Sequence, residues 1–483
     1  MMKKNYWVAI AVGALMLAST VAQAADINFS GQFRPRFNSE NDANENTNSR
    51  NYFDTRVRFN AAANVNANTS VFLQFQSVGV WGSAITLGDN ASNGANATVN
   101  RGSEIGSDVL RDVGFHQAYV TLKNFMGQAV DARIGRQEIV LDGHRLFGHT
   151  GWTQGAQTND AILLTHAGGN HTVNYAFVAS NEANGLANSN DQNTSFHILR
   201  ANTQGIMGGN LTGMFVAADD NSTLATAEDE EIWYTIGARQ AGKLGGLDYR
   251  VEYYHQWGDG GISATSGDHE AAYATTPNNT APGHIDRDAS MFGVRIGKTF
   301  KNSSLSPTIT LWYDSLSGTD DDDIAGNDYG TFHTLQDTGH KFYGLIDNYT
   351  DAIGNGTQRL GLQDIAVKTK WKISDVNTLK LDVHQFLTQT DLEGSDSDTI
   401  RTNAAGAFAA TLNGTGVLSN DLGQEIDVTL VHKYDANTKL VAGYSHYFAT
   451  LTHSLLNGGG GGDNGLDNND GQDWIYLMAD TKF

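Results

Sequence analysis

The feature that most constrains this chain is the regular alternation of long and short connections between its candidate strands. Apolar and polar residues alternate with a period of two in many short segments, the pattern of a strand with one apolar face. The connections between these segments alternate without a break, from 39–50 (long) and 64–69 (short) to 451–471 (long). A soluble sandwich has no reason to alternate its loop lengths. The pattern is typical of an up-and-down barrel whose two ends both lie on the short-turn side.

The predicted fold class is therefore all-β: a transmembrane antiparallel up-and-down β-barrel of about 18 strands, with short periplasmic turns and long extracellular loops. The expected strands are 26–38, 51–63, 70–80, 113–123, 128–137, 159–167, 171–180, 195–203, 210–218, 231–241, 246–257, 289–300, 304–314, 363–373, 377–389, 423–435, 437–450 and 472–483. A mean hydropathy of -0.37 is too polar for a helical membrane protein. It suits strands that show lipid one face and water the other.

The first 24 residues have the order of a secretory signal peptide: Lys3 and Lys4, an apolar run from Tyr6 to Ala18, and a small-residue end at Ala24. The run is shorter than the ~20 residues of a membrane-spanning helix, which disfavours an anchor. We therefore expect a cleavable signal peptide at 1–24, a barrel at 25–483, and location in the outer membrane of a Gram-negative bacterium. The sequence contains no cysteine, so no disulfide framework is expected.

The last expected strand ends on an aromatic residue. Ile475, Leu477, Ala479 and Phe483 share one parity. A terminal aromatic on an apolar face resembles the signal that the barrel assembly machinery reads, although an ordinary edge strand has the same pattern. The expected partners are that machinery, outer-membrane lipid and lipopolysaccharide, and a small anionic solute or polysaccharide, but not a nucleic acid, because the net charge is -22.

Despite this net charge, cations gather on the polar parity of the strands, where they are expected to line the lumen. They are Arg34, Arg36, Arg56, Arg58, Arg133, Arg239, Arg250, Arg295, Lys368 and Lys370. The acids concentrate in long connections, such as 228–231 and 320–323. In one interpretation the lumen attracts anions, as rings of Arg and Lys do in pores. In the other, the cations only pair with acids of the wall such as Asp131, Asp248, Glu252 and Asp382.

The densest group of polar residues lies in the connection 138–158 and its flanking strands, so we expect this loop to fold inward and constrict the lumen. The candidate constriction residues are Arg136, Glu138, Asp142, His144, Arg145, Trp152 and Asp160. They either reach across the lumen and create a transverse field, or pair as Arg136–Glu138 and Asp142–Arg145 to hold the shape of the loop.

The same stretch resembles the alginate-export family of outer-membrane barrels. The matching residues are Gly135-Arg136-Gln137-Glu138, Gly143-x-Arg145-Leu146-x-Gly148, Trp152 and Asp160-Ala161, together with Phe33-Arg34-Pro35-Arg36-Phe37 and Arg56-x-Arg58. The resemblance implies an eighteen-stranded barrel and passive secretion of a polyuronate through an electropositive lumen. Gln157 and Asn159 depart from the pattern, since an Arg and an aromatic residue are expected there. That departure removes one lumen cation and weakens the expectation of a polyuronate.

Other chemistry finds little support in the sequence. No cofactor, catalytic site or metal site is expected. Two acidic loops, with Asp320 to Asp323 and with Asp463, Asp467 and Asp470, have the oxygen ligands that Ca²⁺ takes, but solvated or lipopolysaccharide-bridging acids are the favoured interpretation. Trp81, Trp257, Trp312 and Trp371 are expected in interfacial girdles. The predicted function is passive diffusion of hydrophilic, preferentially anionic solutes. The alternatives are export of an anionic polysaccharide such as alginate, the sheath of a porin–cytochrome electron conduit, and a barrel enzyme or adhesin.

Overall fold

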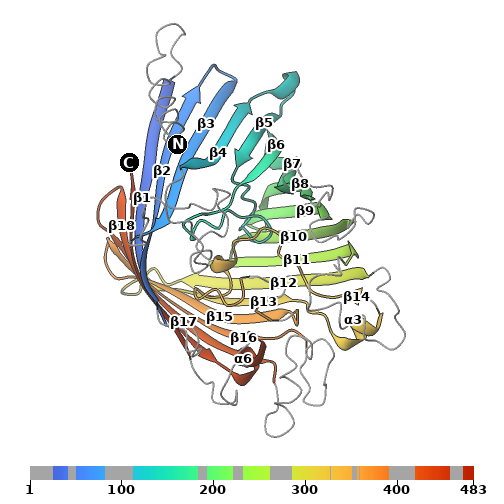
Figure 1. Ribbon diagram of the computed structural model, residues 1–483, viewed down its shortest axis with the longest axis vertical. Helices are drawn as coiled ribbons and strands as arrows, with labels where there is room; N and C mark the ends of the chain where they lie inside the picture. The colour runs from blue at the N-terminus through green and yellow to red at the C-terminus, as the bar shows by residue number, and fades with distance from the viewer. Residues whose placement is uncertain are drawn as a thin grey trace, which may run out of the picture.

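The computed structural model is a closed β-barrel. It describes residues 26–41, 50–81, 113–182, 193–220, 232–260, 285–326, 328–350, 356–357, 359–390, 419–456 and 471–483, so the expected signal peptide lies outside the described residues. Within these ranges, 19 strands form one sheet. Figure 1 shows the strands following one another around the ring, with blue β1 beside the red strands of the C-terminal part. Because β1 pairs with both β19 and β2, the sheet has no free edge at the seam.

The strands and short helices are β1 (Asp26–Asn41), β2 (Arg50–Asn64), β3 (Thr69–Val80), β4 (Gly114–Leu122), η2 (Phe125–Gly127), β5 (Asp131–Gln137), β6 (Asn159–Gly168), β7 (His171–Glu182), β8 (Asn193–Ile206), β9 (Gly209–Asp220), β10 (Ile232–Leu244), β11 (Leu247–Asp259), β12 (Asp286–Thr299), β13 (Thr308–Leu316), α3 (Asp321–Gly326), β14 (Asp328–Tyr329), η3 (Gly339–Lys341), β15 (Leu362–Lys372), β16 (Asn377–Leu387), β17 (Asp421–Lys433), β18 (Thr438–Ala449), α6 (Leu451–Leu456) and β19 (Gln472–Lys482). β14 pairs in parallel with the first two residues of β12, whereas β13 pairs directly with β15. The wall therefore has eighteen antiparallel strands (19 − 1), and the expected fold class is confirmed.

The outer face of the wall is apolar, as a lipid-facing surface requires. Phe292 and Ile296 of β12 and Leu311 of β13 point outward and are 40 %, 47 % and 58 % exposed. Aromatic side chains cluster near the extracellular strand ends, where Phe53 stacks on Trp81 with centroids 5.2 Å apart. Among the described residues, none of the helices has the length and apolar character needed to cross a bilayer.

The expectation of Trp312 in an interfacial girdle was wrong. Trp312 pairs in register with the lumen-facing Arg295, and the Arg295 guanidinium carbon lies 3.0 Å from the centre of its ring. Its indole nitrogen donates to Asp314 at 2.9 Å. This tryptophan supports cations on the inner wall, because the face of its ring attracts positive charge.

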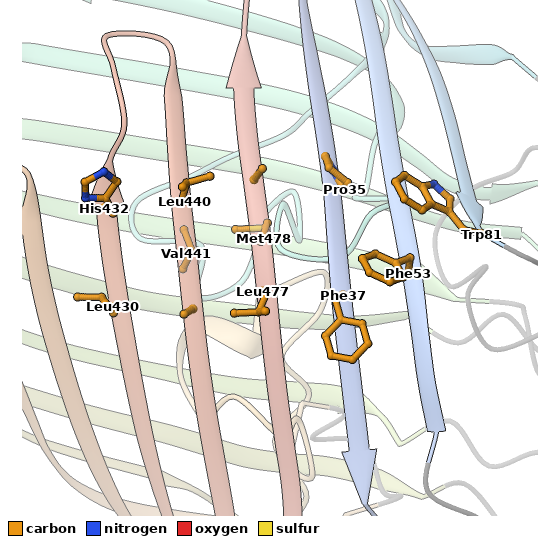
Figure 2. A pocket seen from close by; sticks show the side chains of 12 residues that line it. Pro35, Phe37, Phe53, Trp81, Leu430, His432, Leu440, Val441, Leu477 and Met478 are labelled. Carbon is orange, nitrogen blue, oxygen red and sulfur yellow. The ribbon is translucent and has the colours of Figure 1, made fainter.

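The seam between β1 and β19 carries an apolar groove on the outer surface. The groove has a volume of about 440 Å³ and extends over β17, β18, β19, β1 and β2, with Phe37, Phe53 and Leu477 among its walls (Figure 2). The ladder between β1 and β19 skips Arg34 and Pro35. Proline has no backbone N–H to donate, so it interrupts a ladder. The groove belongs to the lipid-facing surface rather than to the lumen.

The inner face is not polar throughout. Val178, Ile198 and Val216 are at most 1 % exposed, although they point into the barrel. They belong to one core cluster with Phe147 and Phe342, which come from two connections folded into the ring. The alternation of apolar and polar residues fails on β7 to β9 because these strands contact lipid on one side and a folded interior on the other.

Candidate functional site

The connection between β5 and β6, residues 138–158, lies inside the barrel (Figure 1). Its Leu146 and Phe147 are 2 % and 0 % exposed and pack against the inner wall. Phe147 also forms a parallel bridge with Gln336, which belongs to a second inward connection. The expected inward folding of 138–158 agrees with this placement. We call residues 138–158 the first inner loop and residues 331–350 the second inner loop.

Two arginines of the β1–β2 hairpin hold one end of the first inner loop. Arg34 donates to the carbonyl oxygens of Gly151 and Trp152 at 2.8 Å each and to that of Thr153 at 2.9 Å. Arg56 donates to the carbonyls of Gly151 and Thr153 at 3.3 and 3.2 Å. Both side chains are on the lumen face. Arg34 engages the loop through all three of its nitrogens and Arg56 through Nη1, so both side chains position the loop rather than face open solvent.

Replacing both Arg34 and Arg56 with Gln is expected to release residues 151–154 from the wall. A hydrogen bond from a charged donor contributes about 1.5–3 kcal/mol, so the loss of several exceeds the stability of a typical loop. Chymotrypsin should then cut the folded variant after Trp152, whereas the wild type is expected to resist this cleavage. Arg50→Gln is the control, because Arg50 pairs with Glu40 on an exposed surface. Equal resistance of the double variant and the control would contradict the anchoring role.

Arg36 and Arg58 are paired with acids. Arg36 donates to Asp54 at 2.6 Å. Arg58 lies 3.5 Å from Glu138, and His116 Nε2 lies 3.2 Å from the same carboxylate. Burial alone would raise the pKa of Glu138, but the hydrogen bond with His116 and the charge of Arg58 outweigh burial and hold that pKa below its usual range. Glu138 therefore stays ionised and fixes the start of the loop.

The middle of the loop is anchored through Asp142 and carries a neutral histidine. Arg200 of β8 donates to Asp142 at 2.5 Å. Burial, together with the nearby charge of Lys341, lowers the pKa of His144 to about 4. Its imidazole is consequently neutral near pH 7. His144 adds a polar group to the constriction without adding positive charge.

Arg145 is the most completely buried charge of the loop, at 1 % exposure. It donates to Glu252 of β11 at 3.0 and 3.1 Å, to Asp314 of β13 at 2.5 Å, and to the hydroxyl of Tyr343 at 2.6 Å. Its guanidinium also lies over the ring of Phe342, 3.9 Å from the centre. One side chain thus ties the first inner loop to two wall strands and to the second inner loop.

The second inner loop completes the constriction, although no pattern in the sequence predicted its inward folding. His340 stacks on Trp152 of the first loop with centroids 4.6 Å apart, and Lys341 donates to the carbonyl of Gly143 at 3.0 Å. Phe342 and Tyr343 are fully buried. The two loops contact each other along their length and form one folded unit within the ring.

A buried carboxylate fixes the other side of the second inner loop. Glu425 of β17 accepts from the backbone N–H groups of Leu345 and Ile346 at 2.6 and 2.9 Å. Gly344 has a φ of 83°, a conformation that glycine adopts without strain. Successive N–H groups beside such a residue form a concave anion-binding nest. A β-carbon at Gly344 would collide with the buried Glu425 side chain, so glycine is required here.

The expected pairings within the first loop were wrong. Arg136 does not pair with Glu138, and Asp142 does not pair with Arg145. Arg136 instead donates to Asp160 at 3.0 and 2.8 Å through both nitrogens. These two residues have the parity of Ile134 and Ile162, which point outward, so they lie outside the lumen where β5 and β6 part. If β5 continued, Glu138 would share the face of Arg136. The strand ends at Gln137, however, and the chain turns into the lumen, where Glu138 meets Arg58 and His116.

The remaining expected lumen cations lie on the inner face. Arg133 stacks over Tyr119, with its guanidinium carbon 4.7 Å from the ring centre. Lys368 lies 3.8 Å from Asp382. Lys370, on the same face, is opposite Lys380 in the ladder. Arg239, Arg250 and Arg295 surround Glu252 at 3.8 Å each.

Several residues of the site were not singled out from the sequence: Asp314, Arg200, Lys341, Tyr343 and Glu425. One pattern in the sequence does indicate a filled interior. Three expected strands are apolar at both odd and even positions near their long connections, namely 171–180, 195–203 and 210–218. A strand that is apolar on both faces is buried on both faces. The partners of Arg145, in contrast, come from strands more than a hundred residues away, and no local pattern identifies them.

Within the described part of the chain, no group of three or more His, Asp or Glu side chains is placed to hold a metal ion. At the candidate calcium site, the side chains of Asp320 and Asp323 accept from each other's backbone N–H at 2.8 and 2.9 Å. They cap α3. Asp463, Asp467 and Asp470 lie outside the described residues.

Comparison with known proteins agrees with this architecture. The barrel is similar to OccAB1 of Acinetobacter baumannii, with 13 % identity, a TM-score of 0.55, and coverage of 96 % of this chain and 98 % of that chain. It is also similar to OccK8 (OprE) of Pseudomonas aeruginosa, with 11 % identity, a TM-score of 0.52, and coverage of 95 % and 98 %. No curated protein sequence matches. The model of the family described as alginate export matches residues 25–450, and the chain therefore belongs to the alginate export family.

Proposed function

We propose that this protein is an outer-membrane channel through which hydrophilic, preferentially anionic solutes diffuse passively. The observation that carries the proposal is the charge balance beside Arg145. Four arginines (145, 239, 250 and 295) gather around two carboxylates, Glu252 and Asp314, which leaves an excess of two positive charges (4 − 2) in this group. Charge in a narrow space with low-dielectric walls concentrates counter-ions. No catalytic step is part of the proposal.

The likeness to OccAB1 and OccK8, which supports the fold, is compatible with a diffusion channel. The family membership supports a second candidate, export of an anionic polysaccharide such as alginate. The two candidates differ in what must pass the inner loops. A small solute passes a constriction of fixed width, whereas a polymer needs a continuous path for many residues. Uptake of labelled mono-uronates and release of oligo-uronates from proteoliposomes would distinguish them.

The route to the membrane belongs to the same proposal. We infer export through a cleavable peptide at 1–24 and recognition of the last strand by the barrel assembly machinery. In support of the second inference, Phe483 is 64 % exposed, and its backbone exchanges hydrogen bonds with Gly31 at 2.6 and 3.1 Å. The terminal ring is thus presented on the outside at the seam.

The wild-type channel is expected to prefer chloride over potassium in planar bilayers. Reversal potentials in a KCl gradient measure this preference directly. The preference should weaken from 0.1 M to 1 M salt, because the screening length falls from about 10 Å to about 3 Å. A cation preference at low salt would contradict the proposal.

A further inference from the structure

The two inner loops meet along a short ladder of backbone hydrogen bonds. Gln336 N–H donates to the Leu146 carbonyl at 2.9 Å, and Gly148 N–H donates to the Gln336 carbonyl at 2.8 Å. Further along, Thr338 N–H donates to the carbonyl of His144 at 3.1 Å. The loops approach so closely that a β-carbon on Gly148 would collide with the Thr338 side chain. A change of charge at this junction therefore acts directly on the contact between the loops.

Two histidines of the first inner loop lie at the junction. The rings of His144 and His149 have centroids 5.0 Å apart. His144 Nδ1 lies 3.2 Å from the hydroxyl oxygen of Thr338, which also accepts from the backbone N–H of Thr150 at 3.2 Å. The hydroxyl proton is thus available to His144, and Nδ1 accepts it only while that nitrogen carries no proton. This contact between the loops depends on a neutral imidazole.

His149 has even less provision for a positive charge. Its ring packs against the backbone of Gly151, where a β-carbon would lie 2.9 Å from it. Its Nδ1 is buried and has no hydrogen-bond partner among the described residues. One nitrogen of a neutral imidazole carries no proton, whereas the protonated ring has two donors to satisfy. Protonation of His149 in the closed arrangement would therefore leave a buried donor unsatisfied.

The charged groups around the two histidines are mostly positive. The groups that face them are Arg56 and Arg58 of β2, Lys341 of the second inner loop, and one acid, Glu138 of the first inner loop. Lys341 in turn faces Arg145, Arg239, Arg250 and Glu252. Glu138 is already engaged by Arg58 and by His116 of β4. His340, beside Lys341, pairs with Asp347 at 2.7 Å. A proton added at the junction thus meets several cations and one acid that is already paired.

This environment makes proton binding depend on loop contact. Burial, followed by the charges of Lys341 and His149, lowers the pKa of His144 to about 4. Burial also lowers the pKa of His149, and Arg58 adds to that effect. Once the loops separate, both rings meet water and titrate near the ordinary pKa of about 6.5. Because the separated state binds protons more readily, acid favours separation, from about pH 6.5 down to about pH 4.

We propose that His144 and His149 form an acid sensor at the constriction, and that their protonation separates the two inner loops. Acid adds up to two positive charges beside Lys341, and their repulsion acts across the junction. Separation widens the path through the barrel. The effect on current rests on the proposed channel function, whereas the movement of the loops does not.

Single-channel conductance at pH 7.5 and pH 5.0, in the same salt, measures the effect on the path. A pKa of about 4 in the closed state and about 6.5 in the separated state allows roughly a 25-fold rise of the separated population at pH 5.0. His144 is only half-buried, and solvent screening reduces the expected rise to about tenfold. The wild type should therefore spend about ten times longer in a wider state at pH 5.0.

Histidine variants separate this sensor from general titration of the channel. His144→Asn removes the titratable ring, and asparagine tolerates the φ of 68° at this position. His144→Asn and His149→Gln should each reduce the rise to about threefold, and the double variant should abolish it. His171→Gln is the matched control, because His171 lies at a short turn of the wall and bonds to Thr203. It should respond to acid as the wild type does.

The movement itself can be measured without changing either histidine. The chain has no cysteine, so Val140→Cys and Thr350→Cys place one nitroxide label on each inner loop, outside the junction. The distance between the labels, measured by electron paramagnetic resonance, should increase from pH 7.5 to pH 5.0. This measurement tests the proposal even where a histidine variant does not assemble.

An equal label distance at both pH values would overturn the acid sensor. An acid response that persists in the double histidine variant, or that disappears in His171→Gln, would overturn it as well. An increased distance in a protein that conducts no ions at either pH would support the sensor and refute the channel function. Anion-selective conductance with no change of label distance would refute the sensor and leave the channel function standing.

Discussion

Arg145→Ala is expected to release the two inner loops from the wall and from each other. The substitution leaves Glu252 and Asp314 buried with one cation fewer and removes the contact to Tyr343. Breaking a buried ion pair on one side costs about 3–5 kcal/mol. A cost of about 3 kcal/mol corresponds to an increase on the order of a hundredfold in the population with open loops.

The expected result is a larger and noisier single-channel conductance, with cleavage by chymotrypsin after Phe147. Anion preference should fall at the same time, since the excess positive charge beside the loop decreases. Arg136→Ala is the matched control because Arg136 pairs with the half-exposed Asp160 outside the lumen. Exposed pairs contribute about 0–1 kcal/mol. An Arg145→Ala channel with wild-type conductance and protease resistance would show that Arg145 does not hold the constriction.

Glu425→Ala is expected to free the second inner loop on its other side. Two backbone N–H groups lose their acceptor, and each buried unsatisfied donor costs about 1–3 kcal/mol. The segment around Gly344 should detach from β17, so that trypsin reaches Lys341 in the folded protein. The conductance should rise while anion preference is retained, because the substitution leaves the arginines in place.

Glu425→Gln tests the mechanism. Its amide oxygen still accepts from Leu345 and Ile346, so the loop should stay closed and trypsin resistance should approach that of the wild type. If Gln and Ala behave alike, the charge of Glu425 matters rather than its position as an acceptor. If neither changes the conductance, the second inner loop does not limit the pathway.

The barrel itself was predictable from local information. The period of two and the alternating connection lengths are properties of neighbouring residues, and they specified eighteen wall strands close to the observed ones. Small errors at strand ends arose where a turn replaced the first residues: the expected strand at 128 begins at Asp131, after a turn in which Asn124 and Met126 have positive φ. Such turns depend on a few torsions that hydrophobic patterning does not report.

The constriction was predictable in part. The dense polar run at 138–158 indicated an inner loop, and the parity of β1 and β2 placed Arg34 and Arg56 on one face. The partners of Arg34 and Arg56 were not predictable. They are backbone carbonyl oxygens of residues 151–153, and every residue type carries such a carbonyl. The Arg136 error has a similar origin. Proximity in sequence suggested a pair with Glu138, but β5 ends at Gln137, and Glu138 belongs to the inner loop rather than to the strand.

The inner loops and β7 to β9 share one core, so the width of the path and the stability of the fold depend on the same side chains. Phe147, Phe342 and the wall residues Val178 and Ile198 pack as a single cluster. Trimming one of these side chains to widen the path also removes buried contacts, at about 2–5 kcal/mol for a large aliphatic or aromatic group. Substitutions that widen the path for a bulkier solute therefore lower the stability of the fold. Variants with altered permeability should accumulate compensating substitutions in the wall.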